Sequence, residues 1–421
     1  MKIISILLIS LFCLQACSKD SLKDTEIYQG SLQYLAFQKF ASGTMEPDGD
    51  YQPLLPLRDK VEIESFIRLL QTEIGFESLD NRKLAVFIGP IALDHNESSI
   101  QQLINDSFDL AIAYDMPIGF HLDDGMFWTG REDLWKDPEN IEWQDWQGTL
   151  SESRYVDWVQ SRLAPQMCFN CPKVKQAMQE FLEHIAQNIK SRLDELKQLN
   201  KEYLFAGLIT GWETSLDEEF STKKTLGYHA LANRGFSETN KPADIDLERY
   251  NIVYEFIEFM ASTVIDQGIP KEKVYGHVAV FAESTYNQLA SQNPNLEESY
   301  IEINGFATTE SVINPKYQPG FSTYPQEGVF DQIYQTINSA NASNWISSEG
   351  VNMILGNPPR NPGYDMESYL ARHYNYGATA VNIFAFGLRG DPFTNALNDA
   401  VQGTQAIAAY RDFLRGKILI E

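Results

Sequence analysis

Two glutamates stand at the ends of apolar segments, where a carboxylate could take part in chemistry. Glu213 follows the residues ITGW, and Glu349 follows WISS. A charge next to a buried strand is costly unless it has a partner, so neither side chain fits a solvated surface role. One interpretation is structural, with each carboxylate held by an arginine or by backbone amides. The other is that the two carboxyl groups share a site, one as a general acid and base and one as a nucleophile.

The segments that would position these glutamates alternate between strand and helix patterns. Short apolar runs indicate buried strands, and apolar residues at helical spacing follow most of them. We expect strands at residues 33–40, 84–90, 117–125, 203–213, 274–281, 300–307, 345–352 and 380–387. We expect helices at residues 59–75, 98–114, 172–199, 247–267, 329–339, 366–376 and 396–415. The Pro- and Gly-rich stretches 314–328 and 356–363 are expected to be loops over the strand ends.

Eight strands with intervening helices predict an α/β fold, a single (β/α)8 TIM barrel with long loops, over residues 31–421. The main alternative is an open doubly wound sheet, but no Gly-x-Gly-x-x-Gly turn follows an early strand. Functional groups of such barrels lie at the C-terminal ends of the strands. This rule gives candidate substrate-binding residues near the predicted strand ends: His121, Asp123, Asp124, Trp128, Trp212, His277, Asn304 and Tyr324.

Carboxylates on the fourth and seventh strands of an eight-stranded barrel resemble those of the retaining clan A glycoside hydrolases, the 4/7 superfamily. The resemblance is architectural, covers the whole predicted barrel and identifies no family within the clan. It implies that Glu213 is the acid/base, that Glu349 is the nucleophile and that the substrate is a carbohydrate. Many members have Asn directly before the acid/base, whereas this chain has Trp212.

Retaining cleavage of a glycosidic bond needs two carboxyl groups about 5–5.5 Å apart, one protonated and one ionised. Glu349 would attack the anomeric carbon, and Glu213 would protonate the leaving oxygen and later activate water. Tryptophans would stack on sugar rings and the polar candidates would bond hydroxyl groups. Two alternatives stay open: a non-catalytic glycan-binding protein, and an inverting hydrolase with Asp124 or Glu283 as base and carboxyl groups about 6.5–9.5 Å apart.

The beginning of the chain has the pattern of a bacterial lipoprotein signal. Lys2 precedes an apolar run that is too short to span a membrane, and the run ends in LQAC at Cys17. This ending resembles a lipobox, which implies removal of residues 1–16, acylation of Cys17 and a polar tether over residues 17–30. An ordinary secretory signal is the alternative. We expect a lipoprotein of the cell envelope, anchored by lipid such as palmitate at the outer membrane.

Composition limits the possible partners and cofactors. The sequence is 43% hydrophobic and carries a net charge of −25, which argues against binding to nucleic acid and favours a neutral substrate. Cys168 and Cys171 could form a disulfide, a redox pair or half of a zinc site. No second ligand pair at zinc spacing is present in the sequence, so we expect a structural pair. Hydrolysis outside the cytoplasm needs only water, and we predict no cofactor and no metal.

Overall fold

The computed structural model describes most of the chain after residue 30. The described residues are 31–42, 57–75, 78–91, 96–152, 155–156, 161–162, 164–216, 219, 224–279, 306–323, 329–342, 344–350, 366–383 and 405–417. Cys17 and the predicted signal and tether lie outside them, as do Glu283, Asn304 and Tyr324. In the described part, no helix is both long and apolar enough to cross a membrane.

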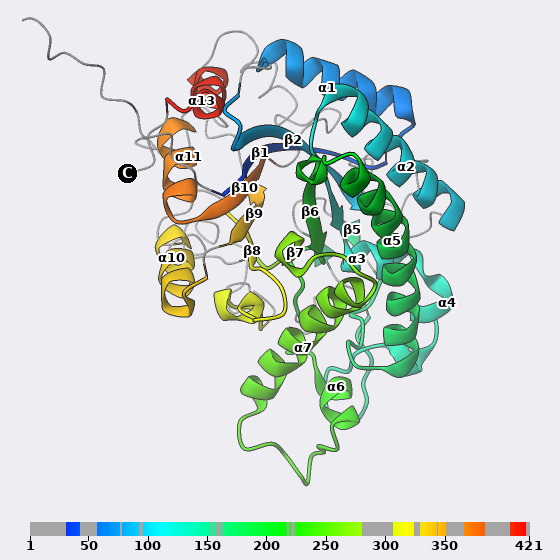
Figure 1. Cartoon of the computed structure of the whole chain (residues 1–421). Coiled ribbons are helices and arrows are strands. Elements are labelled where there is room, and N and C mark those ends of the chain that lie inside the picture. The colour runs from blue at the N-terminus through cyan, green and yellow to red at the C-terminus, as the bar shows by residue number, and fades with distance from the viewer. Residues whose placement is uncertain are drawn as a thin grey trace, which may run out of the picture.

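The fold is the predicted (β/α)8 barrel (Figure 1). Its parallel strands are β1 (Gln33–Lys39), β2 (Arg82–Ile91), β3 (Ile118–Leu122), β6 (Phe205–Thr210), β7 (Val274–Gly276), β8 (Gly320–Ser322), β9 (Trp345–Gly350) and β10 (Ala378–Ile383). They pair in the order β7-β6-β3-β2-β1-β10-β9-β8. Backbone bonds close the ring between β7 and β8, where the Gly276 amide donates to the carbonyl of Gln318 at 3.0 Å and the Ser322 amide donates to that of Val278 at 3.0 Å.

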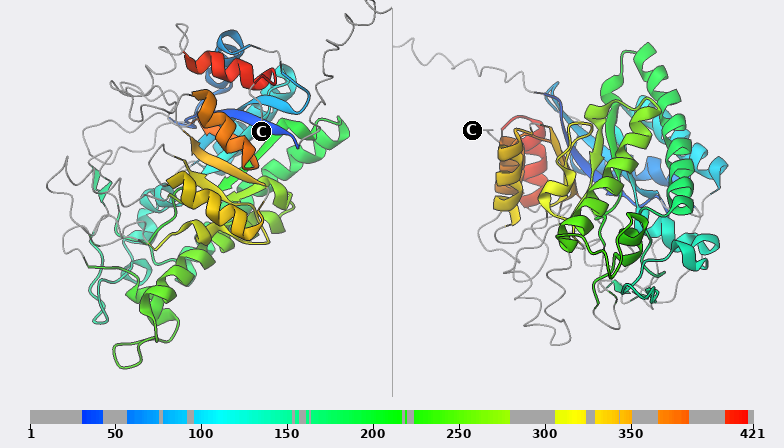
Figure 2. Two further views of the ribbon diagram at one scale, coloured as in Figure 1. Left: turned by 90° about the vertical axis from the view of Figure 1, so that its left-hand side faces the viewer. Right: turned by 90° about the horizontal axis from the view of Figure 1, so that it is seen from below.

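The helices surround the strands. The long ones are α1 (Lys60–Glu73), α2 (Glu97–Tyr114), α5 (Pro172–Gln198), α7 (Ile245–Asp266), α10 (Val329–Ala340), α11 (Met366–Asn375) and α13 (Gln405–Leu414). Helices α1, α2, α5 and α7 follow one another along one side, and α10, α11 and α13 along the other (Figures 1 and 2). Shorter elements, all in the loops, are α3 (Asp124–Gly130), α4 (Glu132–Trp135), η1 (Pro138–Asn140), β4 (Tyr155–Val156), β5 (Ser161–Arg162), η2 (Glu202–Leu204), α6 (Tyr228–Asn233), η3 (Lys271–Lys273) and η4 (Thr309–Val312).

Two apolar clusters hold the barrel together. The larger lies between the strands and the helices, because nearly continuous apolar strands are buried on both faces. The smaller includes Tyr34, Phe87, Ile209 and Tyr275 from four different barrel strands. Side chains therefore fill the inside of the barrel, and a site can form only at the ends of its strands.

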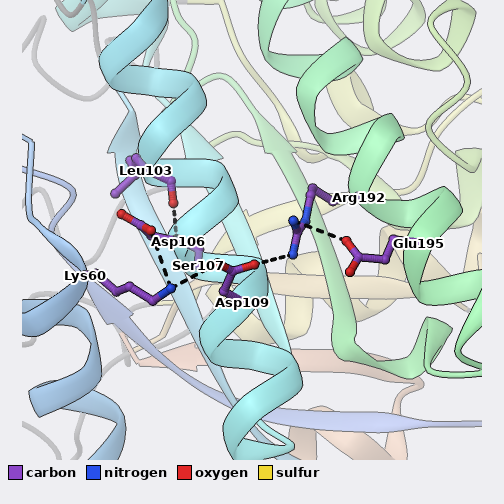
Figure 3. A network of polar contacts seen from close by, with 7 residues as sticks. All are labelled: Lys60, Leu103, Asp106, Ser107, Asp109, Arg192 and Glu195. Carbon is purple, nitrogen blue, oxygen red and sulfur yellow. Dashed lines mark hydrogen bonds and ion pairs between the residues drawn. The ribbon is translucent and has the colours of Figure 1, made fainter.

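Charged side chains join three of the outer helices (Figure 3). Lys60 of α1 lies 3.0 Å from Asp109 of α2, and Asp109 lies 2.6 Å from Arg192 of α5. Arg192 also pairs with Glu195 at 3.2 Å, and Asp106 lies 3.7 Å from Lys60. Exposed pairs contribute little singly, so this network aligns the helices more than it stabilises them.

One predicted strand was wrong. The sixth barrel strand is β8, which lies within the stretch 314–328 that we expected to be a loop. Of the predicted strand 300–307, residues 306 and 307 are described, and they form a turn and an irregular segment. The predicted third strand also ends early, because its last residues cap and begin helix α3.

Candidate active site

Glu213 stands just beyond the end of β6, the fourth barrel strand. The chain turns there through Gly211, whose φ is +85°, and Glu213 itself has a φ of 51°. Left-handed backbone at a residue other than glycine costs of the order of 1 kcal/mol and needs support from its surroundings. Such strain is concentrated at functional sites, so the backbone itself marks Glu213.

Asp124 supplies that support from helix α3. Its buried carboxylate accepts a hydrogen bond from the Trp212 amide at 2.9 Å and another from the Thr214 hydroxyl at 3.1 Å. The Thr214 amide in turn donates to the carbonyl of His277 at 3.4 Å. The turn that carries Glu213 is therefore fastened on both sides of that residue.

Glu349 lies inside β9, the seventh barrel strand, and only 1% of it is exposed. It pairs in register with Ser322, the last residue of β8. The Glu349 carbonyl accepts a hydrogen bond from the Thr323 amide at 2.8 Å, which fixes the end of β8 against β9. Both glutamates thus occupy C-terminal strand ends, on the fourth and seventh strands as expected.

The hydroxyl of Ser322 lies between the two carboxyl groups. Its Oγ is 2.5 Å from Glu213 Oε1 and 3.3 Å from Glu349 Oε2, and His277 Nε2 approaches it at 2.9 Å. One oxygen of each glutamate and one ring nitrogen of His277 all lie within 4.8 Å of one another. The two carboxyl groups are consequently close enough to act on the same atom of a bound molecule.

The same three ligand atoms have a spacing at which a divalent cation could bind. Ser322 Oγ is within hydrogen-bond distance of all three, so the hydroxyl lies where a shared ion would have to lie. Glutamate oxygens and an imidazole suit several metals, but only if Ser322 moves away. The arrangement as it stands is a hydrogen-bonded cluster.

Two buried histidines lie beneath the carboxyl pair. His121 Nε2 is 3.1 Å from His277 Nδ1, and His121 Nδ1 is 3.1 Å from Gln38 Oε1. Burial lowers the pKa of His277 to about 3 and lowers the pKa of His121 well below its usual range. The ring of Trp212 stacks on His121 with their centroids 4.2 Å apart. Both rings are therefore neutral at physiological pH.

Several residues that we predicted to contact a ligand make hydrogen bonds within the protein instead. All four ring nitrogens of His121 and His277 are engaged inside the protein, so direct contact with a sugar is not their role. Asp123 caps helix α3 by accepting from the Met126 amide at 2.8 Å, and Asp124 holds the Glu213 turn. Trp128 packs in the larger apolar cluster, and its indole N–H donates to the carbonyl of Pro165.

Sequence reasoning missed two members of the site, Ser322 and Gln38. Ser322 follows from the same strand-end rule that gave the glutamates, but only once 320–322 is read as a strand. Gln38 is a polar residue near the C-terminal end of the apolar run that forms β1, and it is fully buried. A buried amide needs partners, so its presence within a core strand was the available signal.

Residues 131–171, between β3 and α5, are fastened to the loop after β6. The buried carboxylate of Glu142 accepts from the amides of His229 at 3.0 Å and Ala230 at 2.8 Å, and burial raises the pKa of Glu142 to about 7. Trp143 stacks on His229 at 4.2 Å. Cys168 and Cys171 form a disulfide, as one interpretation of their spacing held.

A cavity with a volume of about 480 Å³ lies elsewhere, between α5 and α7. Its lining includes Lys175, Glu183, Phe259 and Lys316, and it shares no residue with the carboxylate pair. The mixed charges along it show no arrangement of nucleophile and base. The chemistry of the described residues is concentrated at the strand ends.

Comparison with known proteins finds only distant similarities. No protein-family model and no curated protein matches the sequence. The glycoside hydrolase domain of PgaB (BpsB) from Bordetella bronchiseptica is similar, with 13% identity, a TM-score of 0.48 and coverage of 91% of this chain and 99% of that one. A broad-specificity endoglucanase from Bacteroides salanitronis has 11% identity, a TM-score of 0.40 and coverage of 91% and 93%. A 3-keto-D-glucoside 4-epimerase from E. coli has 8% identity, a TM-score of 0.34 and coverage of 89% and 100%.

These structural neighbours include glycoside hydrolases, but they are too distant to transfer an activity. Barrels of this kind carry many different chemistries, and function resides in the site that each one bears. The function of this chain must therefore be argued from its own residues.

Proposed function

We propose that this protein is a retaining glycoside hydrolase, with Glu349 as nucleophile and Glu213 as acid/base. The observation that carries the proposal is the approach of one Glu213 oxygen to within 4.8 Å of one Glu349 oxygen at the mouth of the barrel. That separation suits retaining hydrolysis, for which the carboxyl groups are about 5–5.5 Å apart. It is shorter than the separation of about 6.5–9.5 Å that an inverting enzyme needs.

The two glutamates differ in the way that their proposed roles require. Glu349 is 1% exposed, while Glu213 is partly exposed on the strained turn, so a substrate would reach the pair from the side of Glu213. Glu349 would attack the anomeric carbon as Glu213 protonates the leaving oxygen. Glu213 would then take a proton from water, and this water would release the sugar from Glu349.

The two alternatives find less support. An inverting mechanism with Asp124 as base would need a carboxylate that faces water, whereas Asp124 is buried and bonded to the turn around Glu213. A non-catalytic glycan-binding protein would not need two carboxyl groups in contact with one hydroxyl. Bringing them together costs free energy that a binding role would not recover.

Activity assays on a panel of 4-nitrophenyl glycosides and soluble polysaccharides test this proposal. Once a substrate turns over, NMR of the first product should show the anomeric configuration of the substrate. Glu349→Ala should abolish turnover, and azide should rescue it as a glycosyl azide of opposite configuration. Glu213→Ala should lower kcat by ~10²–10⁴-fold on natural leaving groups and much less on activated aryl ones.

Two results would exclude the enzyme we describe. An inverted product would exclude the retaining mechanism. Absence of turnover on every glycoside, together with unchanged polysaccharide binding by Glu349→Ala, would favour the glycan-binding alternative.

We also propose that the barrel is held at the outer membrane by lipid on Cys17, with a glycan outside the cytoplasm as its substrate. The support is the lipobox-like ending of the first 17 residues. Cells grown with radioactive palmitate should label the wild-type chain and not Cys17→Ser. Equal labelling of the two chains would contradict the anchor.

A further inference from the structure

A buried row of four side chains runs from the inside of the barrel to the carboxyl pair. It consists of Gln38, His121, His277 and Ser322, and we call it the inner row. Each contacts the next at 3.1, 3.1 and 2.9 Å, and none is more than 1% exposed. Because water does not reach these groups, each hydrogen between them must be donated by one member and accepted by its neighbour.

Gln38 fixes the direction of donation at the inner end. Its Nε2 donates to the carbonyl of Gly89 at 3.3 Å, and its Oε1 accepts from Asn382 Nδ2 at 2.7 Å. The second hydrogen of that Asn382 nitrogen goes to the carbonyl of Ser348 at 2.8 Å. Turning the Gln38 amide over would set two carbonyl oxygens against each other at Gly89 and two N–H groups against each other at Asn382. The oxygen of Gln38 therefore faces His121, so His121 Nδ1 must carry a proton.

This proton determines the rest of the row. A neutral His121 with its proton on Nδ1 leaves Nε2 as an acceptor, so His277 must donate from Nδ1. A neutral His277 protonated on Nδ1 leaves its Nε2 as an acceptor, so the hydroxyl of Ser322 must donate to it at 2.9 Å.

Ser322 has one proton, and the inner row uses it. Its oxygen then faces the carboxyl groups only as an acceptor, so the short contact of 2.5 Å with Glu213 Oε1 requires a proton on that carboxyl. We propose that the inner row sets the protonation of the carboxyl pair, keeping Glu213 as the acid and leaving Glu349 ionised. The acid and nucleophile roles in this statement rest on the function proposed above.

The alternative distribution has the same number of protons. An imidazolium would be shared by His121 and His277, Ser322 would donate to a carboxylate, and both glutamates would be ionised. Burial lowers the pKa of both histidines, and two neighbouring carboxylates repel each other when both are charged. The neutral row with a protonated Glu213 leaves a single charge, on Glu349, where the alternative has three.

The inner row would act in both halves of the reaction without changing its own protons. When Glu213 gives its proton to the leaving oxygen, Ser322 can donate to the new carboxylate only by leaving His277 Nε2 without a donor. Otherwise the Glu213 carboxylate and the Ser322 oxygen face each other as two acceptors, so Glu213 takes a proton readily from the incoming water. Gln38, His121 and His277 are positioning residues, since they act through Ser322, which alone among the four contacts both carboxyl groups.

Histidine tautomers test the proposal without any substrate. The full chain labelled with ¹⁵N-histidine has six histidines, which single His→Asn variants assign. At pH 7, long-range ¹H–¹⁵N spectra should show His121 and His277 neutral and protonated on Nδ1. An Nε2 proton on either ring, or an imidazolium, would overturn the proposal.

Two variants separate the role of the row from simple packing. Gln38→Met removes the acceptor at similar length, so both rings should gain a measurable population protonated on Nε2. Ser322→Ala should keep both Nδ1 protons and shift only the His277 Nε2 resonance. If Gln38→Met leaves the tautomers of both histidines unchanged, Gln38 does not set the direction of hydrogen-bond donation along the inner row.

The proton on Glu213 can be observed directly. The infrared difference between wild type and Glu213→Gln at pH 7 should show loss of a protonated-carboxyl carbonyl band, and Glu349→Gln should show loss of carboxylate bands instead. Carboxylate loss in both variants would refute the assignment. If the tautomers are as predicted but the protein cleaves no glycoside, the inner row is confirmed and the proposed function is wrong. If the protein cleaves a glycoside but the tautomers differ, the proposed function holds and the inner row is wrong.

Discussion

Asp124 holds the chain on both sides of Glu213. The Trp212 amide and the Thr214 hydroxyl both donate to the same Asp124 oxygen. Because Glu213 has a φ of 51°, the turn would relax if these bonds were lost. Glu213, the proposed acid/base, is therefore positioned by a carboxylate from the preceding β/α unit.

Asp124→Ala should misplace Glu213. We expect kcat to fall ~10²-fold, with a smaller change in KM, because a displacement of about 1 Å in a reacting group has this effect. Steady-state kinetics on any aryl glycoside that the wild type cleaves would measure it.

Asp123→Ala is the matched control, since the carboxylate of Asp123 is adjacent in sequence and caps helix α3. It should lower the free energy of unfolding by ~1 kcal/mol and leave kcat near the wild-type value. Equal losses of kcat in the two folded variants would contradict a specific role for Asp124.

Removal of divalent metals should not affect turnover. The hydroxyl of Ser322 occupies the centre of the Glu213, His277 and Glu349 cluster, and it bonds all three. Dialysis against EDTA followed by activity assay checks this. Loss of activity that returns with one added metal would show that Ser322 moves aside for an ion.

The protein should lose stability in acid through its buried histidines. His373 is fully buried among aromatic rings, and burial lowers its pKa from 6.5 to about 3. Below pH 6.5, His373 binds a proton in the unfolded chain but not in the folded chain. The free energy of unfolding therefore falls as the pH drops from 6.5 towards 3. One such histidine accounts for about 2 kcal/mol between pH 7 and pH 5.

Urea unfolding of His373→Phe at the two pH values measures this contribution. The variant should lose about 2 kcal/mol less than wild type between pH 7 and pH 5, whatever its stability at pH 7. His184→Gln, at a partly buried position on α5, should keep the wild-type difference. An unchanged difference in His373→Phe would show that His373 titrates normally.

Gly320→Ala should open the barrel where β7 meets β8. A Cβ at this position would lie 2.3 Å from the carbonyl oxygen of Gly276, a backbone atom that cannot move aside cheaply. We expect a loss of ~3 kcal/mol in unfolding free energy, with turnover reduced because Ser322 shifts. Gly235→Ala has no neighbour within 4 Å of its added Cβ and should cost only ~1 kcal/mol, from its φ of +88°. Thermal unfolding of both variants compares the two.

The barrel and the glutamates could be predicted because they depend on local signals. Short apolar runs marked β2, β6 and β10, the pair Trp345-Ile346 marked β9, and the strand-end rule then placed Glu213 and Glu349. Strand β8 could not be found in this way, because three residues are too few for a pattern and the apolar segment 300–307 nearby offered a stronger one.

The roles of His121 and His277 depended on contacts between distant parts of the chain. Each histidine lies on or next to a strand, and the sequence does not say whether a ring points to the mouth or to the interior. The partner of His121 is Gln38, 83 residues earlier, and that of His277 is Ser322, 45 residues later. Only the closed barrel brings them together.

The bond between Glu142 and the amides of α6 bears on how such a site could change its specificity. The substrate specificity of barrel enzymes changes through replacement of their loops, and each loop can usually be replaced independently. Here a graft of residues 131–171 without Glu142 would bury the amides of His229 and Ala230 with no carboxylate to accept from them. A graft of residues 211–244 that changed the first turn of α6 would leave the Glu142 carboxylate without these two donors. The two segments must therefore be exchanged together, so chimaeras of this protein should have their junctions outside both.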